Sequence, residues 1–234
     1  MNIAYKLKSS ASRFASGLGY KVERQLPAIT NSIDLLSLAL KSKGCFSECR
    51  FVQIGANDGE TDDPIFRFIS SPDSRWRGVL LEPQASAFAH LSRKYANNPR
   101  IQLENSALNE YDGPADFYVS AKHDLLAGLS SSSLKNRVSK RTPIEKIQVN
   151  CISPETFCKK FDIISLDLLV VDTEGFDADA VILCLRSNLC PDVILFEHIN
   201  VPKQKLRECF LVLESRGYEL LRHGIDVIAI NSAR

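Results

Sequence analysis

Short apolar runs constrain the fold of this chain more than any other feature. Residues 79–81 read VLL, residues 168–171 read LLVV and residues 193–196 read VILF, and segments with helical patterning separate them. Strands that are apolar at nearly every position are covered on both faces, as in parallel sheets. Regular alternation of such strands with helices predicts an α/β fold, with a mostly parallel sheet and helices on both faces.

The same pattern places the elements along the chain. We expect parallel strands at residues 50–55, 77–83, 100–108, 166–175 and 191–198, and helices at 31–43, 62–70, 84–97, 153–161, 177–187 and 202–217. Residues 218–231 predict two strands around His223 and Gly224, and so short a connection permits only antiparallel pairing. These seven strands form one predicted sheet, and residues 115–120 and 145–152 predict an inserted β pair.

The amino-terminal part differs in composition from the rest. Residues 1–22 carry four basic residues and no acid, and residues 31–43 predict an amphipathic helix capped by Asn31 or Ser32. We interpret residues 1–44 as a helical appendage and residues 45–234 as the main domain. A transit peptide or a membrane-surface helix is the alternative for the basic start.

Charge and cysteine content narrow the class of protein. The net charge is +1, which gives no argument for a nucleic-acid partner, and we predict none. The seven cysteines are odd in number and form no CxxC pair, which indicates free thiols in a reducing compartment and a cytoplasmic location. No stretch approaches the roughly 18 apolar residues of a membrane span, so we predict no integral span.

Ligands of open parallel sheets bind beyond the carboxyl ends of the strands. Gly55 and Gly59 follow the first strand with Ala56 and Asn57 between them, in a pattern that is neither GxGxxG nor a P-loop. The glycines are consistent with either a simple turn or a loop that lets a ligand approach the backbone. Glu82 ends the second strand and follows Gly59 by 23 residues, a separation typical of a ribose-binding acid.

Polar side chains also follow the other strands. Asn105, Ser106 and Ala107 end the third strand, where a polar residue can reach an adenine edge. Asp172, Glu174 and Asp177 leave the fourth strand, and Asp177 can simply cap the next helix. Glu197 and His198 end the fifth strand, and we expect a functional role for one of them. The serine-rich, basic stretch 120–143 is either a solvated surface loop or a lid over the substrate.

Five segments, QIGANDGE, LLEP, LENSAL, VVDTEGFDADAV and ILFEH, together resemble the FkbM family over residues 50–200. The resemblance implies a Rossmann-like, S-adenosylmethionine-dependent class I methyltransferase that methylates hydroxyl oxygens, frequently on sugars or other natural products. It implies that Gly55, Ala56, Asn57 and Gly59 surround the methionine part of the cofactor, that Glu82 binds the ribose and that residues 105–107 border the adenine. Asp172 and Glu174 would lie near the methyl group.

Two residues depart from the patterns of these enzymes. Methyltransferases of this class commonly carry an acid two residues before the first glycine, and this chain has Gln53, which can bind the cofactor's amino group only without charge. Asp177 stands where the family often has a glutamate.

The resemblance therefore implies an O-methyltransferase with a small-molecule acceptor such as a sugar or glycan. Asp172, Glu174 and His198 are the candidate catalytic bases, because a carboxylate or imidazole can take the proton of an alcohol. We predict no resident metal, although the same carboxylates suit Mg²⁺. Two alternatives remain, a non-catalytic cofactor-binding or scaffold protein on this fold and a nicotinamide-dependent oxidoreductase.

Overall fold

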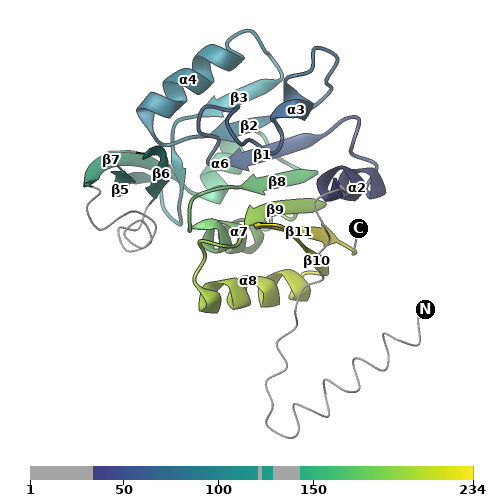
Figure 1. Cartoon of the computed structure of the whole chain (residues 1–234). Helices are drawn as coiled ribbons and strands as arrows, with labels where there is room; N and C mark the ends of the chain where they lie inside the picture. Colours follow the sequence, from purple (N-terminus) through teal and green to yellow (C-terminus); the bar gives the residue numbers. More distant parts are fainter. Residues whose placement is uncertain (1–33, 121–122, 129–142, 234) are drawn as a thin grey trace, which may run out of the picture.

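The computed structural model describes residues 34–120, 123–128 and 143–233 (Figure 1). Its main sheet has seven strands in the order β10-β11-β9-β8-β1-β2-β3. The strands are β1 (Arg50–Ile54), β2 (Arg77–Leu81), β3 (Ile101–Glu104), β8 (Leu168–Val171), β9 (Val193–Glu197), β10 (Tyr218–His223) and β11 (Asp226–Asn231). Neighbours from β9 to β3 pair in parallel, and β11 pairs antiparallel with both β9 and β10. The predicted sheet and its antiparallel carboxy-terminal hairpin are confirmed.

Helices cover both faces of this sheet, as predicted. They are α2 (Leu35–Ser42), α3 (Phe66–Ile69), α4 (Ala85–Tyr95), α6 (Pro154–Lys160), α7 (Asp177–Arg186) and α8 (Lys203–Ser215). One face packs against α6, α7 and α8 through a core that includes Val52, Phe157 and Phe196. The opposite face packs against α2, α3 and α4 through a core that includes Phe51 and Leu91. Residues 51 and 52 of β1 thus point to opposite sides, which is why the strand reads as apolar without interruption.

Two helix starts differ from the sequence prediction. Asp34 caps α2, because its side chain accepts a hydrogen bond from the Ser37 N–H at 3.0 Å, whereas Asn31 and Ser32 lie outside the described residues. Helix α3 begins only at Phe66, four residues later than expected. Asp62 has a φ of +55°, which interrupts a helix, and the Asp63 carboxylate accepts the N–H groups of Ile65 and Phe66 at 2.7 and 2.9 Å.

Helix α2 belongs to the main core. Its residues Leu35, Leu36, Ala39 and Leu40 are buried with Phe51 of β1. The division at residues 44 and 45 stays a prediction, and α2 packs directly on the main sheet. The basic segment 1–22 lies outside the described residues.

A second, smaller sheet lies beside the main one, at the left of Figure 1. Its four strands are ordered β4-β7-β5-β6 and comprise β4 (Ala107–Leu108), β7 (Ile144–Ile152), β5 (Gly113–Ser120) and β6 (His123–Gly128). The predicted inserted β pair is β5 with β7, and these two strands are antiparallel. Strand β6 falls within the stretch 120–143 that the sequence suggested to be a loop or a lid, and residues 121–122 and 129–142 of that stretch lie outside the described residues.

The seven cysteines are all free, and five of them are buried. No helix in the described part of the chain combines the length and the apolar character needed to cross a membrane.

Replacing Phe196 by Ala tests the core between β9 and the helices below it. The Phe196 side chain is fully buried, so Phe196→Ala should lower the free energy of unfolding by about 3–5 kcal/mol, through lost burial and the cavity left behind. Urea denaturation under reducing conditions measures the change. Leu211→Ala on α8 is the matched control, because Leu211 is 61% exposed and its removal should cost less than about 0.5 kcal/mol. Equal decreases in the free energy of unfolding in the two variants would contradict the placement of Phe196 in the core.

Candidate active site

A pocket opens at the carboxyl ends of β1, β2 and β8. Its empty space, counted together with the open solvent at its mouth, is about 970 Å³. The predicted residues that line it are Gln53, Gly55, Ala56, Asn57, Glu82, Ser106, Ala107, Asp172 and Glu174. The small sheet adds Leu108, Phe117 and Gly128, which sequence reasoning did not single out. Folding thus brings nine of the twelve candidate residues to one cavity.

The turn after β1 is clamped between its two neighbouring strands. The N–H groups of Gly55 and Ala56 both donate to the Leu81 carbonyl, at 3.0 and 2.9 Å, and the Asp172 N–H donates to the Ile54 carbonyl at 2.9 Å. Gly55 has a φ of +82°, and a Cβ atom there would lie 1.8 Å from the Asp172 carbonyl oxygen. Only glycine fits this position, so Gly55 is needed both by the packing of the turn and by its conformation.

Glu82 joins the first loop to the second. Its carboxylate accepts the Asn57 N–H and the Gln84 N–H, both at 2.8 Å, and the residue is only 4% exposed. Burial raises the pKa of Glu82 to about 7, although these two hydrogen bonds oppose the shift. A carboxylate oxygen has two lone pairs, so each oxygen can accept a further hydroxyl donor from the pocket.

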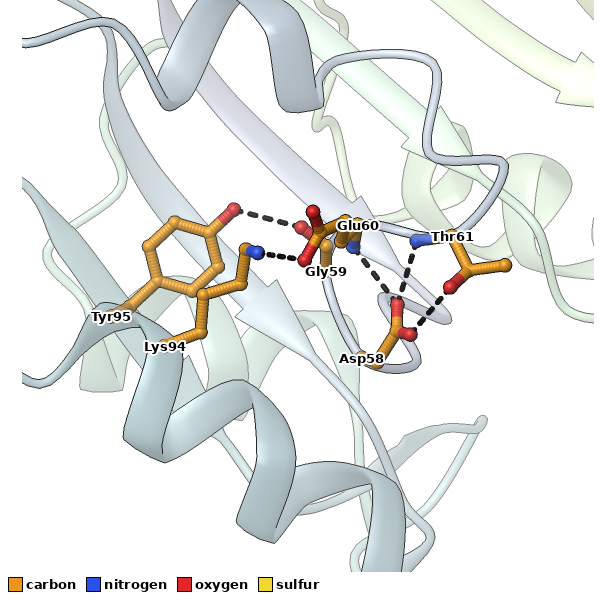
Figure 2. Close-up of polar contacts among 6 residues, drawn as sticks. All are labelled: Asp58, Gly59, Glu60, Thr61, Lys94 and Tyr95. Carbon is orange, nitrogen blue, oxygen red and sulfur yellow. Dashed lines mark hydrogen bonds and ion pairs between the residues drawn. The ribbon is translucent and has the colours of Figure 1, made fainter.

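The second half of the loop after β1, residues 58–61, is held by contacts within the loop and with α4 (Figure 2). The Asp58 carboxylate accepts the N–H groups of Glu60 and Thr61, both at 2.9 Å, and so closes the turn on itself. Lys94 pairs with Glu60, and the Tyr95 hydroxyl donates to the Gly59 carbonyl at 3.0 Å.

Gly59 does not line the pocket. It has a φ of +70°, and a Cβ atom there would lie 2.6 Å from Leu91 and 2.8 Å from Tyr95. This glycine therefore lets the loop pack on α4. Asn105 also lies outside the lining, and its side chain donates to the carbonyls of Glu82 and Pro83, at 2.8 and 3.2 Å. Gly59 and Asn105 therefore support the loops that form the pocket without lining it themselves.

The turn after β8 is held by a buried acid. Asp177 has no exposed surface, and its carboxylate accepts the Thr173 N–H at 3.1 Å and the Gly175 N–H at 2.8 Å. Burial raises the pKa of Asp177 to about 7, against the opposing effect of these bonds. The sequence suggested Asp177 as a helix cap, but the N-cap of α7 is Phe176. The Asp177 carboxylate instead fixes the preceding turn, in which Glu174 adopts the left-handed conformation at a φ of +59°.

The fifth strand delivers a different residue from the one that we named as a candidate base. Carboxylate oxygens of Asp172, Glu174 and Glu197 all lie within 4.8 Å of one another. Val171 and Phe196 are register partners on β8 and β9, so the residues after them, Asp172 and Glu197, lie level at the sheet edge. The register of β8 with β9 is what identifies Glu197 as a member of this group of acids, and local sequence does not reveal a strand register.

His198 is turned away from these acids. Its ring Nε2 faces the Gly224 carbonyl oxygen at 3.4 Å, in the turn between β10 and β11, and it is not part of the pocket lining. Asn200 instead completes the cluster, because its amide donates to Glu197 at 3.0 Å and to Glu174 at 3.4 Å. The acid cluster, meaning Asp172, Glu174 and Glu197, has the donor set of a divalent-cation site as well as that of a general base.

Comparison with known proteins places this geometry in context. The model of the methyltransferase FkbM domain matches residues 53–220. A search of curated protein sequences gives no match.

Solved structures are similar only at low identity. Fibrillarin from Aeropyrum pernix, crystallised with natively bound S-adenosyl-L-methionine, is 14% identical over 82% of this chain and 73% of its own, with a TM-score of 0.43. A methyltransferase from Geobacter sulfurreducens is 16% identical over 99% and 90%, with a TM-score of 0.44. A putative rRNA-methylase from Clostridium thermocellum is 11% identical over 86% and 96%, with a TM-score of 0.48. Structural similarities at such low identity and TM-score support no conclusion about function. The match to the FkbM domain is therefore the finding that assigns this chain to a family.

Glu82 is the predicted ribose ligand, so we expect nucleoside binding to depend on pH. Hydroxyl donors favour its carboxylate form, so binding should strengthen as the pH rises through about 7 and weaken as Glu82 becomes protonated below it. We expect affinity for 5′-methylthioadenosine to be about tenfold lower at pH 6 than at pH 8 by calorimetry. This ligand carries the ribose hydroxyls without the titratable groups of methionine. The Glu82→Gln variant should bind weakly at every pH, and an unchanged pH dependence in that variant would refute the assignment.

Proposed function

The chain belongs to the FkbM methyltransferase family and uses S-adenosylmethionine, and we propose that it methylates a hydroxyl oxygen of a small molecule such as a sugar. The observation that supports this proposal best is that acids suited to two different ligands, a ribose and an alcohol, line one pocket. A buried acid suited to a ribose, Glu82, and two acids suited to an alcohol, Asp172 and Glu174, line the same cavity.

The residues present fit the cofactor. Glu82 has lone pairs to spare for the two ribose hydroxyls, and Gly55, Ala56 and Asn57 line the same cavity. Ser106 and Ala107 follow β3 and line the pocket, and their position supports the role of bordering the adenine. Bound S-adenosylmethionine supplies an electrophilic methyl group on a sulfonium, and the protein's main task is to align the acceptor oxygen with it.

We assign Glu174 as the base that takes the acceptor's proton. It lines the pocket, Asn200 orients its carboxylate, and its backbone occupies a conformation that non-glycine residues rarely adopt. Strain of this kind, held in place by the buried Asp177, is typical of functional positions. Asp172 lies beside Glu174 and can bind a neighbouring hydroxyl of the acceptor.

The polar and aromatic lining supports a sugar as the acceptor. Carboxylates and amides bind the hydroxyls of a polyol, and the rings of Phe117 and Phe176 line the same pocket and can cover the apolar face of a sugar ring. A net charge of only +1 also gives no support for a nucleic acid as the acceptor.

A labelled methyl group tests the reaction. The enzyme is incubated with S-adenosylmethionine that carries a ¹³C methyl group and with a panel of sugars and hydroxylated metabolites, and products are read by ¹³C NMR. An O-methyl resonance in at least one product is expected. Label found only on nitrogen or carbon atoms would refute O-methylation while leaving the family assignment intact.

Glu174→Gln tests the base, with the acceptor that this panel identifies. The variant should lose about 10²–10⁴-fold in kcat, because the amide cannot take a proton, while calorimetry shows unchanged cofactor affinity. His198→Gln should change kcat less than about threefold, since that ring faces Gly224. Glu219→Gln, on the exposed side of β10, is the matched charge control. A large loss of kcat in His198→Gln, together with an unchanged kcat in Glu174→Gln, would identify His198 rather than Glu174 as the base.

Removal of divalent cations tests whether the acid cluster acts as a general base or binds a cation. If Glu174 acts directly as the base, treatment with EDTA followed by desalting should leave the rate of methyl transfer unchanged. Loss of activity that Mg²⁺ restores would place a cation among Asp172, Glu174 and Glu197.

A further inference from the structure

Gln53 carries an unsatisfied polar atom at the pocket. The residue is 2% exposed and lines the cavity, and its Nε2 donates to Asp63 Oδ2 at 3.2 Å. Its Oε1 is buried and has no hydrogen-bond partner among the described residues. An unsatisfied buried acceptor is unfavourable, so a ligand that brings a donor to this oxygen gains free energy.

Asp63 lies beside Gln53 and also lines the pocket. Its Oδ1 accepts the N–H groups of Ile65 and Phe66, and its Oδ2 accepts only the Gln53 amide. Within the described part of the chain, no lysine, arginine or histidine forms an ion pair with Asp63. The carboxylate therefore has hydrogen-bonding capacity left and a charge that no protein cation neutralises.

The surrounding loop is acidic. Asp58, Glu60, Asp62 and Asp63 lie within six residues of sequence, and Lys94 compensates only Glu60 by a direct ion pair. Burial and the nearby Asp58 both raise the pKa of Asp63. A positive charge placed at this wall of the pocket would relieve the repulsion.

The position of Asp63 is fixed before any ligand arrives. Asp58 closes the first part of the loop, and Tyr95 and Lys94 hold that part on α4 (Figure 2). Asp62 adopts a positive φ, and the two N–H groups at the start of α3 anchor the Asp63 carboxylate. A preorganised carboxylate binds a charged group without first losing conformational freedom.

We propose that Asp63 and Gln53 together bind the α-ammonium group of the methionine part of the cofactor. Gln53 Oε1 accepts one N–H of the ammonium, and Asp63 supplies the negative charge that residue 53 itself lacks. The acid that methyltransferases of this class commonly carry on the first strand is thus replaced by one ten residues later, brought back to the strand by the loop. The inference rests on S-adenosylmethionine as the cofactor.

Two ligands distinguish this role from a structural one. S-adenosylhomocysteine contains the ammonium group, and 5′-methylthioadenosine has the same nucleoside without it. Calorimetry should show that Asp63→Asn weakens S-adenosylhomocysteine about 10–100-fold, as expected for a charged hydrogen bond, and changes 5′-methylthioadenosine less than twofold. Asparagine keeps an oxygen for the N–H groups of Ile65 and Phe66, so the fold should survive.

Moving the charge provides the stronger test. The double variant Q53E/D63N places the acid on the strand itself and should recover most of the lost affinity for S-adenosylhomocysteine. Asp73→Asn, which removes an exposed acid outside the pocket lining, is the matched control and should bind both ligands normally.

Each failure has a separate meaning. Equal loss of both ligands in Asp63→Asn, or no loss of either, would overturn the ammonium site, and so would a folded double variant without recovery. If the unmodified protein bound neither ligand, the cofactor assignment itself would fail.

Discussion

The contact between the turns after β1 and β8 is the constraint on which the rest of the site depends. The Asp172 carbonyl occupies the space where a side chain of residue 55 would lie, and the Asp172 N–H bonds to Ile54. This contact brings the glycine loop and the acid cluster to the same cavity. Any side chain at residue 55 would have to separate the two turns, and with them the glycine loop and the acid cluster.

Buried carboxylates do much of the positioning around that contact. Glu82 and Asp177 each accept two backbone N–H groups and each lie almost wholly away from solvent, so their desolvation raises both pKa values to about 7. Each uses its two oxygens to fix a turn that regular secondary structure cannot satisfy. Asp63 extends the same arrangement to the start of α3. Asp177 thus only holds the backbone, whereas Glu82 and Asp63 hold the backbone and also line the pocket.

Sequence patterns predicted the elements well because burial on both faces leaves a local record. The run LLVV could only be a covered strand, and Ser153 followed by Pro154 marked the start of α6, where the Ser153 hydroxyl accepts the Thr156 N–H at 3.3 Å. Residues whose role depends on distant partners were harder to interpret. Gly59 resembles a ligand-loop glycine in sequence, but the side chains of Leu91 and Tyr95 determine its place. Glu197 and His198 are neighbours in sequence, and only the pairing of β8 with β9 distinguishes them.

The amino-acid sequence by itself determined the order of strands and helices, the hairpin at the end and the acids at the strand ends, because hydrophobic periodicity and turn residues act locally. Tertiary structure decided which acids meet. Strand register set Glu197 beside Asp172, and the path of one loop returned Asp63 to Gln53 across ten residues. Such contacts depend on the packing of whole elements against one another, which no short stretch of sequence encodes.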